Sequence, residues 1–518
     1  MRKKSVIVLM FVGLLALLMT ACNGSDSDGS IDSSDSMKAN EIASVIVGLD
    51  ASITSLDPAN HRDRTTESVL RNIYDGLVKI TDDGEVEGLI AESWENPSPT
   101  EWVFKIKDGI KFHEGSDLTV DDVVFTFERI INEGAMGGET SPRQGLLGTL
   151  EKVEAVDDSH VKFTFESPWP IFLKMLPHQQ IVPKAYLEEV GDEEFRNNPI
   201  GSGPFKFVEG NLDERIVLER FDDYHGGAAK IKHLVFDVIP ELSSRVSALQ
   251  AGEVHRIVAV SPAIAEELLH DDNVEVKNVN STRAYMLEMN VEMEPFDNPQ
   301  VRKAMNHAIN MDTIIGSIFG EYVERLPGPM LTDSFAHHDG LEFYEYDPEK
   351  AKQILVEEGY GDGFSVVIDT EDMNKEVAEA IANNLREIGI DANTRIWDMA
   401  VLREMLLDGE RQMFLGSWGN SSLDPYDFLN PKLKTGDRGN YSQYSNPRLD
   451  ELLEAGDVEL DEAKREEIYL EAQEIIYEDA PWVFGFTLSE IEAGHKSLQN
   501  WSPRFDGMIY MDEATLVE

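Results

Sequence analysis

The stretch of residues 101–131 constrains the fold most, because two kinds of hydrophobic period follow each other within it. Between residues 102 and 106, apolar side chains alternate with less apolar ones, which is the period of a strand with one buried face. Asp108-Gly109 is a pair typical of a tight turn. Residues 110–113 are therefore predicted to return as a second strand.

A helix is predicted directly after this hairpin. Thr119 stands at the N-cap position, acidic residues fill the first turn, and apolar residues then recur with helical spacing. Residues 44–49 indicate a strand, residues 68–77 a helix, and residues 461–478 a long helix that Pro481 ends. Because strand and helix patterns alternate along the chain, the predicted fold class is α/β.

Length and charge narrow the class of protein. A chain of 518 residues is too long for one core, so two or three domains are expected. The 45 Lys and Arg residues against 98 Asp and Glu residues give a net charge of −53. Such a charge repels phosphate backbones, so nucleic-acid binding is excluded. Solubility in a salty or alkaline exterior explains the acid excess most simply, and steering of cationic substrates is the alternative.

The N-terminus has the features of an export signal. Arg2-Lys3-Lys4 is positively charged, and residues 6–19 form an apolar run that is short for a membrane span. We therefore predict that residues 1–21 are a signal peptide. Residues 19–22, Met-Thr-Ala-Cys, resemble a bacterial lipobox.

The lone cysteine is predicted to carry a membrane anchor. Cys22 is the only cysteine, so no intramolecular disulfide can form. Lipidation there would add more than one acyl chain, which stable anchoring requires. Residues 22–43 are assigned to the lipidated cysteine and a flexible tether, because residues 23–40 are rich in Ser, Asp and Gly. A plain secretory signal with a stray thiol is the alternative.

Several strings resemble one known family. Residues 102–129, WVFKIKDGIKFHEGSDLTVDDVVFTFER, closely resemble the signature of the extracellular solute-binding proteins of peptide and nickel ABC importers, the family 5 binding proteins. Residues 91–94 (AESW) and 295–309 (PFDNPQVRKAMNHAI) are similar to further family landmarks. The resemblance covers nearly all of residues 44–503.

The resemblance implies a two-lobe periplasmic-binding-protein-like α/β fold of type II, with the extra subdomain of the peptide-binding cluster. A ligand cleft would lie between the lobes. Lobe I would comprise residues 44–279 and 484–518, with the extra subdomain at about 60–196, and lobe II would comprise residues 280–483. The chain would cross between the lobes near Asn280 and Phe484.

No catalytic residue, metal site or cofactor is predicted. The nucleophile elbow, the zinc-protease motif and the phosphate-binding loop are all missing. His113-Glu114 begins like a zinc-protease motif, but Asp117 stands where the second histidine would be. His337-His338-Asp339 could in principle bind a metal, yet no partner ligands follow at known spacing.

The candidate ligand residues lie in residues 414–430, FLGSWGNSSLDPYDFLN, which line the cleft in peptide-binding relatives. Trp418 resembles the tryptophan of those relatives and would offer contact area, with lobe packing as the alternative. Ser421 stands where the relatives carry an aspartate that pairs with the ligand's α-ammonium. Asp424 is the nearest acid that could replace it, with a turn role before Pro425 as the alternative.

Two tyrosines complete the candidate site. Residues 440–447, NYSQYSNP, are similar to a family string that lies near the cleft. Tyr441 and Tyr444 are candidates for a ligand wall, and core packing is the alternative.

The resemblance implies the substrate-binding component of an ABC importer. It would capture short or modified peptides, glutathione-like compounds included, as a lipid-anchored monomer. It would deliver them to a permease and ATPase complex, from the outer face of a Gram-positive-type membrane or the periplasmic side. It would not be an enzyme. A receptor for peptide signals or a chaperone on the same fold, nickel-complex binding, and a secreted hydrolase are the alternatives.

Overall fold

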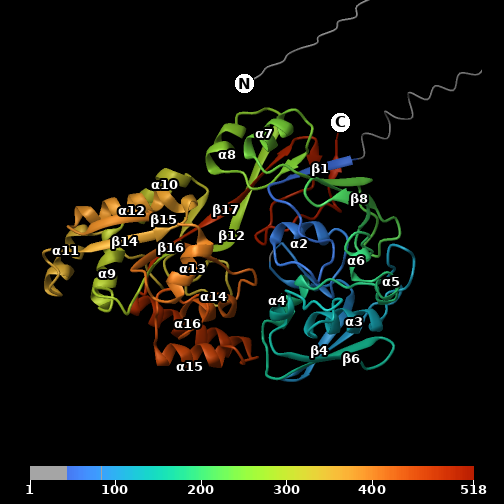
Figure 1. Ribbon diagram of the computed structural model, residues 1–518, viewed down its shortest axis with the longest axis horizontal. Coiled ribbons are helices and arrows are strands. Elements are labelled where there is room, and N and C mark those ends of the chain that lie inside the picture. Colours follow the sequence, from blue (N-terminus) through green and yellow to red (C-terminus); the bar gives the residue numbers. More distant parts are fainter. Residues whose placement is uncertain (1–43, 83, 518) are drawn as a thin grey trace, which may run out of the picture. The chain divides into compact units, whose positions relative to one another are not determined.

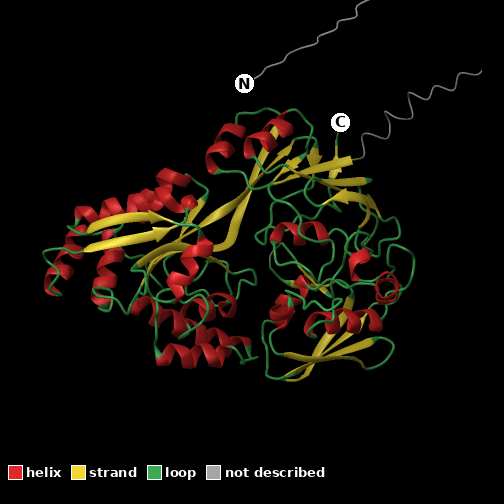
Figure 2. Cartoon of the chain, viewed as in Figure 1, coloured by secondary structure: helices red, strands yellow, loops and turns green. Residues whose placement is uncertain are grey.

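The computed structural model describes residues 44–82 and 84–517. The predicted signal peptide and the tether with Cys22 lie outside the described residues. Within those residues, no helix is both long and apolar enough to span a membrane. Helices and strands are mixed along the chain, as Figures 1 and 2 show, which confirms the predicted α/β class.

The largest sheet of the described chain has 11 strands, with both parallel and antiparallel pairs. In spatial order its strands are β15 (Asp391–Ile396), β14 (Ser365–Thr370), β16 (Met413–Gly419), β12 (Val274–Met289), β17 (Trp482–His495), β11 (Arg256–Ile257), β1 (Ser44–Leu49), β10 (His233–Val238), β9 (Arg215–Arg220) and β8 (Phe205–Asn211), and β13 (Val323–Arg325) also pairs with β17. The strand predicted at residues 44–49 is β1, with the same bounds.

The long strands β12 and β17 connect two groups of core residues. One group contains residues 45–236 together with 498–514, and the other contains residues 284–486. We call the first part lobe I and the second lobe II. The antiparallel pairing of β12 with β17 shifts register between Asn280 and Ala284. The boundaries predicted for the two lobes stay a prediction.

Three smaller sheets belong to lobe I. They are β4–β5–β7–β6 (Ala91–Ser98, Glu101–Ile106, His160–Phe165 and Leu150–Ala155), β2–β3 (Val78–Ile80 and Val86–Gly88) and β18–β19 (Leu498–Gln499 and Thr515–Leu516). The return strand predicted at residues 110–113 is wrong, because β5 pairs with β4 and β7 instead. Residues 110–118 close on themselves: the Phe112 amide donates to the Ser116 carbonyl, and the Leu118 amide donates to the Ile110 carbonyl.

The helices cover the sheets. They are α2 (Arg64–Leu70), α3 (Val120–Ile131), α4 (Phe172–Met175), α5 (Lys184–Val190), α6 (Asp192–Phe195), α7 (Leu242–Gln250), α8 (Pro262–Leu268), α9 (Pro299–Ala308), α10 (Met311–Phe319), α11 (Pro348–Glu357), α12 (Lys375–Glu387), α13 (Met399–Leu407), α14 (Pro425–Leu433), α15 (Pro447–Gly456) and α16 (Glu462–Asp479), with short 3-10 turns η2 (Gln144–Leu147), η3 (Leu176–His178) and η4 (Asp372–Asn374). Thr119 caps α3 as predicted, in a capping box with Asp122. The helix predicted at residues 68–77 instead occupies Arg64–Leu70, because Asp63 caps it by accepting a hydrogen bond from the Thr66 amide.

Candidate ligand-binding cleft

The segment with the predicted ligand residues is held between the central sheet and a helix. Strand β16 pairs with β12, so Trp418 lies opposite Ala284. The chain then turns through residues 420–424 into α14. The Asn420 amide donates to the Thr282 carbonyl at 2.6 Å, and Asn420 Oδ1 accepts from the Asp424 amide at 3.1 Å. These bonds place the turn at the point where the chain leaves the sheet.

Asp424 caps α14 and is already paired with a cation. Its Oδ1 accepts a hydrogen bond from the Tyr426 amide at 3.0 Å. The Arg465 guanidinium of α16 donates to both carboxylate oxygens, at 2.7 and 2.6 Å. Two parallel charge-assisted bonds of this kind are strong and specific. A ligand ammonium at Asp424 would therefore have to compete with Arg465, and the role predicted for Asp424 in amine binding stays a prediction.

The next acid along α14, Asp427, has no cationic partner. Its Oδ2 accepts hydrogen bonds from the hydroxyls of Ser421 and Ser422, at 3.3 and 3.5 Å. It forms no ion pair with any residue of the described chain. Burial raises the pKa of the Asp427 carboxyl, and His178 of lobe I acts in the opposite direction. The sequence analysis missed Asp427, because an acid in the first turn of a helix is common without any ligand.

Two guanidiniums share the space around Asp427. Burial and the charge of Arg438 lower the pKa of Arg62, while Asp427 raises it. These opposing effects show that Arg62 of lobe I lies within electrostatic reach of both groups from lobe II. The Arg438 guanidinium also lies over the Trp418 ring, 5.2 Å from its centroid. The charges of Asp427 and Arg438 therefore both act on Arg62 from lobe II.

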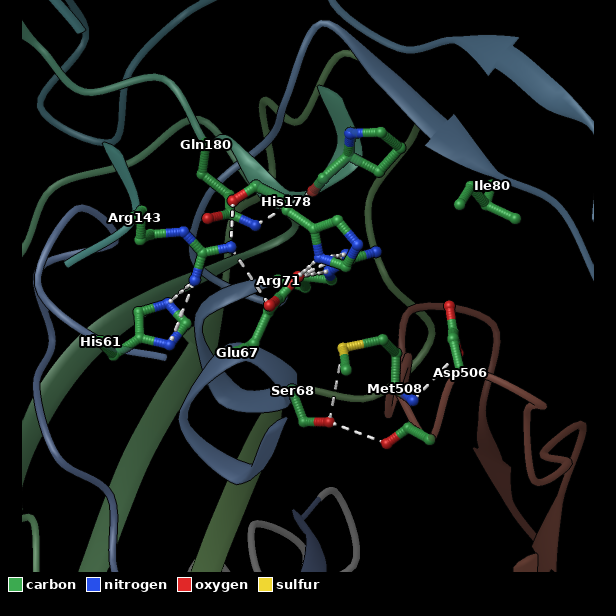
Figure 3. A network of polar contacts seen from close by, with 12 residues as sticks. His61, Glu67, Ser68, Arg71, Ile80, Arg143, His178, Gln180, Asp506 and Met508 are labelled. Atoms are coloured by element: carbon green, nitrogen blue, oxygen red, sulfur yellow. Dashed lines mark hydrogen bonds and ion pairs between the residues drawn. The ribbon is translucent and has the colours of Figure 1, made fainter. Parts of the chain in front are cut away.

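A buried polar network fixes the lobe I side of this space (Figure 3). Glu67 accepts hydrogen bonds from Arg71 Nε at 3.0 Å and Arg143 Nη2 at 3.3 Å, and its Oε1 lies 2.7 Å from His178 Nδ1. Burial would raise the pKa of Glu67, but His178, Arg71 and Arg143 hold it well below its usual value. Arg143 Nη1 also lies 2.8 Å from Nε2 of His61, the neighbour of Arg62 in the chain. No sequence motif signals this network, since Arg143 and His178 are far from Glu67 in the chain.

Aromatic side chains line a cavity between the lobes. The cavity has a volume of about 630 Å³. Its lining residues include Trp94 and Trp102 of lobe I and Phe335, Ser421 and Asp424 of lobe II. A cavity of this size and composition suits a small organic ligand.

A smaller cavity adjoins the first turn of α14. Its volume is about 240 Å³, and Asp427 and Arg438 are among its lining residues. The indole N–H of Trp418 donates to the Asp427 carbonyl at 3.4 Å, so the structure brings Trp418, Ser421 and Asp427 together.

The two candidate tyrosines are packed inside lobe II. Tyr441 packs against Phe414, with ring centroids 5.6 Å apart. Tyr444 is 4% exposed, and its hydroxyl donates to Asp479 Oδ2 at 2.5 Å. These contacts favour the packing alternative, and a role in the ligand wall stays a prediction.

His337 and His338, which were considered as metal ligands, contact different acids. His337 Nε2 lies 3.9 Å from Asp339, and His338 Nε2 lies 3.4 Å from Glu474. Across residues 44–82 and 84–517, no group of three or more His, Cys, Asp or Glu side chains is placed to hold a metal ion.

The sequence model of the bacterial extracellular solute-binding proteins, family 5 Middle, matches residues 85–440. The chain belongs to this family. Among the relatives of this family 5 protein, glutathione-binding protein GsiB of Pectobacterium atrosepticum is 28% identical over 490 residues, which cover 91% of this chain and 94% of GsiB. The resemblance drawn from the sequence strings is thereby confirmed.

Solved structures confirm the two-lobe fold of the family 5 protein. HbpA2 from Haemophilus parasuis superposes with a TM-score of 0.85 at 23% identity, covering 92% of this chain and 100% of HbpA2. The periplasmic binding protein DppA from Helicobacter pylori, in complex with the peptide STSA, superposes with a TM-score of 0.74 at 28% identity, covering 93% of this chain and 99% of DppA.

Proposed function

We propose that this family 5 protein captures short or modified peptides, glutathione-like compounds included, outside the cell and delivers them to an ABC permease with its ATPase. Family membership, the similarity to GsiB and the similarity to peptide-bound DppA support this proposal. The observation that carries it is the mixed charge of the cleft: Asp427, which has no ion pair in the described chain, lines one small cavity with Arg438, and the charges of both act on Arg62 of lobe I. Such a pattern fits a ligand with both an ammonium and a carboxylate.

Asp427 takes the ligand's ammonium in this proposal. The Ser421 hydroxyl cannot neutralise a buried ammonium, and Asp424 already neutralises Arg465. Asp427 is the acid we propose for the ammonium, because its carboxylate is half-buried and its partners, the two serine hydroxyls and the Ser422 backbone, carry no positive charge. Arg62 and Arg438 then take carboxylates of the ligand, and guanidiniums suit this task because they bind carboxylates with two parallel bonds.

Ligand binding would favour closure of the two lobes. Arg62 and His178 belong to lobe I, whereas Asp427 and Arg438 belong to lobe II. A ligand that contacts both sets binds the closed state more tightly than the open state, and this difference shifts the equilibrium. The protein performs no reaction on its ligand. It acts as a monomer attached to the outer membrane face through Cys22.

A calorimetric titration panel tests the ligand class. The panel contains glutathione, di- and tripeptides, their N-acetyl forms, sugars and nickel chelates. We expect binding of peptide-like compounds with free ammonium and carboxylate groups, and a weakening of about tenfold or more in Trp418→Ala. Binding of sugars or nickel chelates alone would contradict the proposal.

Growth on the ligand as sole nitrogen source separates import from the alternatives. Deleting the permease should abolish the growth that this protein supports. Growth support that persists without the permease would favour a chaperone or a signal receptor. Peptide or glycan products that accumulate during long incubation with the purified protein would favour a hydrolase.

A further inference from the structure

A second cavity lies within lobe I. Its volume is about 370 Å³, and its lining residues come from residues 71–89, 177–224 and 500–513. The cleft residues Asp427, Arg62 and Trp418 are not among them. Arg71, a member of the Glu67 network, lines the cavity, as do Gln180 and Ile80 (Figure 3). Cavities that hold small ligands have volumes of roughly 300–1,000 Å³.

Two partly or fully buried carboxylates line this cavity. Asp75 Oδ2 lies 2.6 Å from His225 Nε2, and Asp75 Oδ1 accepts a hydrogen bond from the Tyr224 hydroxyl at 3.3 Å. Asp512, on the C-terminal segment, forms no ion pair within the described chain. Burial raises the pKa of both carboxyls, and the charge of Asp512 raises that of Asp75 further. The two carboxylates therefore repel each other, while His225 lowers the pKa of Asp75 and Lys79 lowers that of Asp512 without forming an ion pair with it.

The cations that line the cavity are engaged elsewhere. Arg71 donates to Glu67, and Arg504 donates to both oxygens of Asp506. Lys79 Nζ forms its ion pair with Glu87, at 3.2 Å. None of these three cations forms an ion pair with Asp75 or Asp512.

An independent sign of a missing partner comes from an uncharged atom. Gln180 is 2% exposed, and its Oε1 has no hydrogen-bond partner among the described residues. Gln180 lines the cavity. Because buried polar groups are normally satisfied, this oxygen indicates an occupant that donates a hydrogen bond.

We propose that this cavity binds a small organic cation, with an ammonium or guanidinium group placed between Asp75 and Asp512. The cation balances the two carboxylates and donates a hydrogen bond to Gln180 Oε1. Tyr224, which also lines the cavity, adds an aromatic ring of the kind that attracts cations. The site goes beyond peptide capture, since it shares no residue with the groups proposed to bind the peptide.

Calorimetric titration of the full chain with putrescine and agmatine tests this site. 1,4-Butanediol is the neutral control of similar length. We expect both cations to bind and the diol not to bind. Asp512→Asn should weaken the cations about tenfold or more, since it removes one of the two charges. Asp512→Lys should abolish binding, because it places a tethered ammonium in the cavity.

Two controls keep the test independent of peptide binding. Asp427→Asn should leave the affinity for the cations unchanged, and both Asp512 variants should still bind the peptide ligand if they fold. Equal binding of the diol, no heat from either cation with the wild-type protein, or unchanged cation affinity in folded Asp512 variants would overturn the site. None of these results would contradict peptide capture.

Discussion

Asp424 and Arg465 form a bidentate ion pair inside lobe II, with N–O distances of 2.7 and 2.6 Å. Their side chains are 3% and 6% exposed. The pair joins the turn after β16 to helix α16. An acid that the sequence analysis proposes for the ligand thus has a structural partner.

Asp424→Asn should lower the free energy of unfolding by about 3–5 kcal/mol, because it leaves Arg465 buried without a counter-charge. Urea unfolding measures this change. Glu451→Gln is the control, since its ion pair with Arg448 is exposed, and such a pair contributes about 0–1 kcal/mol. A stability equal to that of the control, with loss of free-amine ligands, would instead make Asp424 the amine partner.

Asp427→Asn should weaken ligands with a free amine by about tenfold or more, because it removes the carboxylate proposed to pair with the ligand's ammonium. N-acetylation of the same ligand should then lower its affinity for the variant only a little further. A double-mutant-style cycle of Asp427→Asn against acetylation, read by calorimetry, measures the coupling. The same cycle with Asp424→Asn should show coupling near zero. Coupling with Asp424→Asn and none with Asp427→Asn would instead make Asp424 the partner of the ammonium.

The stability of lobe II should depend on pH through Asp457. Burial raises the pKa of Asp457 to about 6, although Asn430 Nδ2 donates to its Oδ1 at 2.6 Å. Because the folded state holds this proton more tightly than the unfolded chain, Asp457 contributes stability below about pH 4 that is lost as pH rises through about 6. Between these limits the loss should be about 2 kcal/mol after solvent screening.

Urea unfolding of the wild type and of Asp457→Asn across this pH range isolates the effect of Asp457. The stability of the wild type relative to the variant should fall as the pH rises. A difference between the two proteins that stays constant with pH would rule out this titration.

Cys22→Ala should release the protein from the membrane, because Cys22 is the only residue proposed to carry an acyl anchor. Cell fractionation followed by immunoblotting measures the membrane-bound share. Ser36→Ala, in the same tether, is the control and should stay bound. An unchanged membrane-bound share of Cys22→Ala would contradict the anchor.

Local patterns predicted those elements whose signals are local. The apolar pattern of residues 44–49 indicates a strand before its partners β10 and β11 are known, and Thr119 caps α3 through a residue three places away. Residues 110–113 look like a strand, but their hydrogen bonds go to residues 116–118 and 201. The period of apolar residues carries no information about such hydrogen bonds.

The sequence did not reveal the partners of the candidate site residues. Asp424 and Asp427 lie three positions apart, and what separates their surroundings is Arg465, which is distant in the chain and pairs with Asp424. The cavity of lobe I likewise depends on Asp75 meeting Asp512. Charge pairing of this kind follows from tertiary contacts, which one sequence does not reveal.

Small-angle scattering with and without saturating ligand tests the central claim, that the two lobes close on a peptide-like solute. The ligand is the peptide-like compound that binds most tightly in the calorimetric panel. The account predicts a smaller radius of gyration for the bound protein, because contacts to Arg62 and Asp427 draw the lobes together. An unchanged radius at a ligand concentration where calorimetry proves saturation would contradict it.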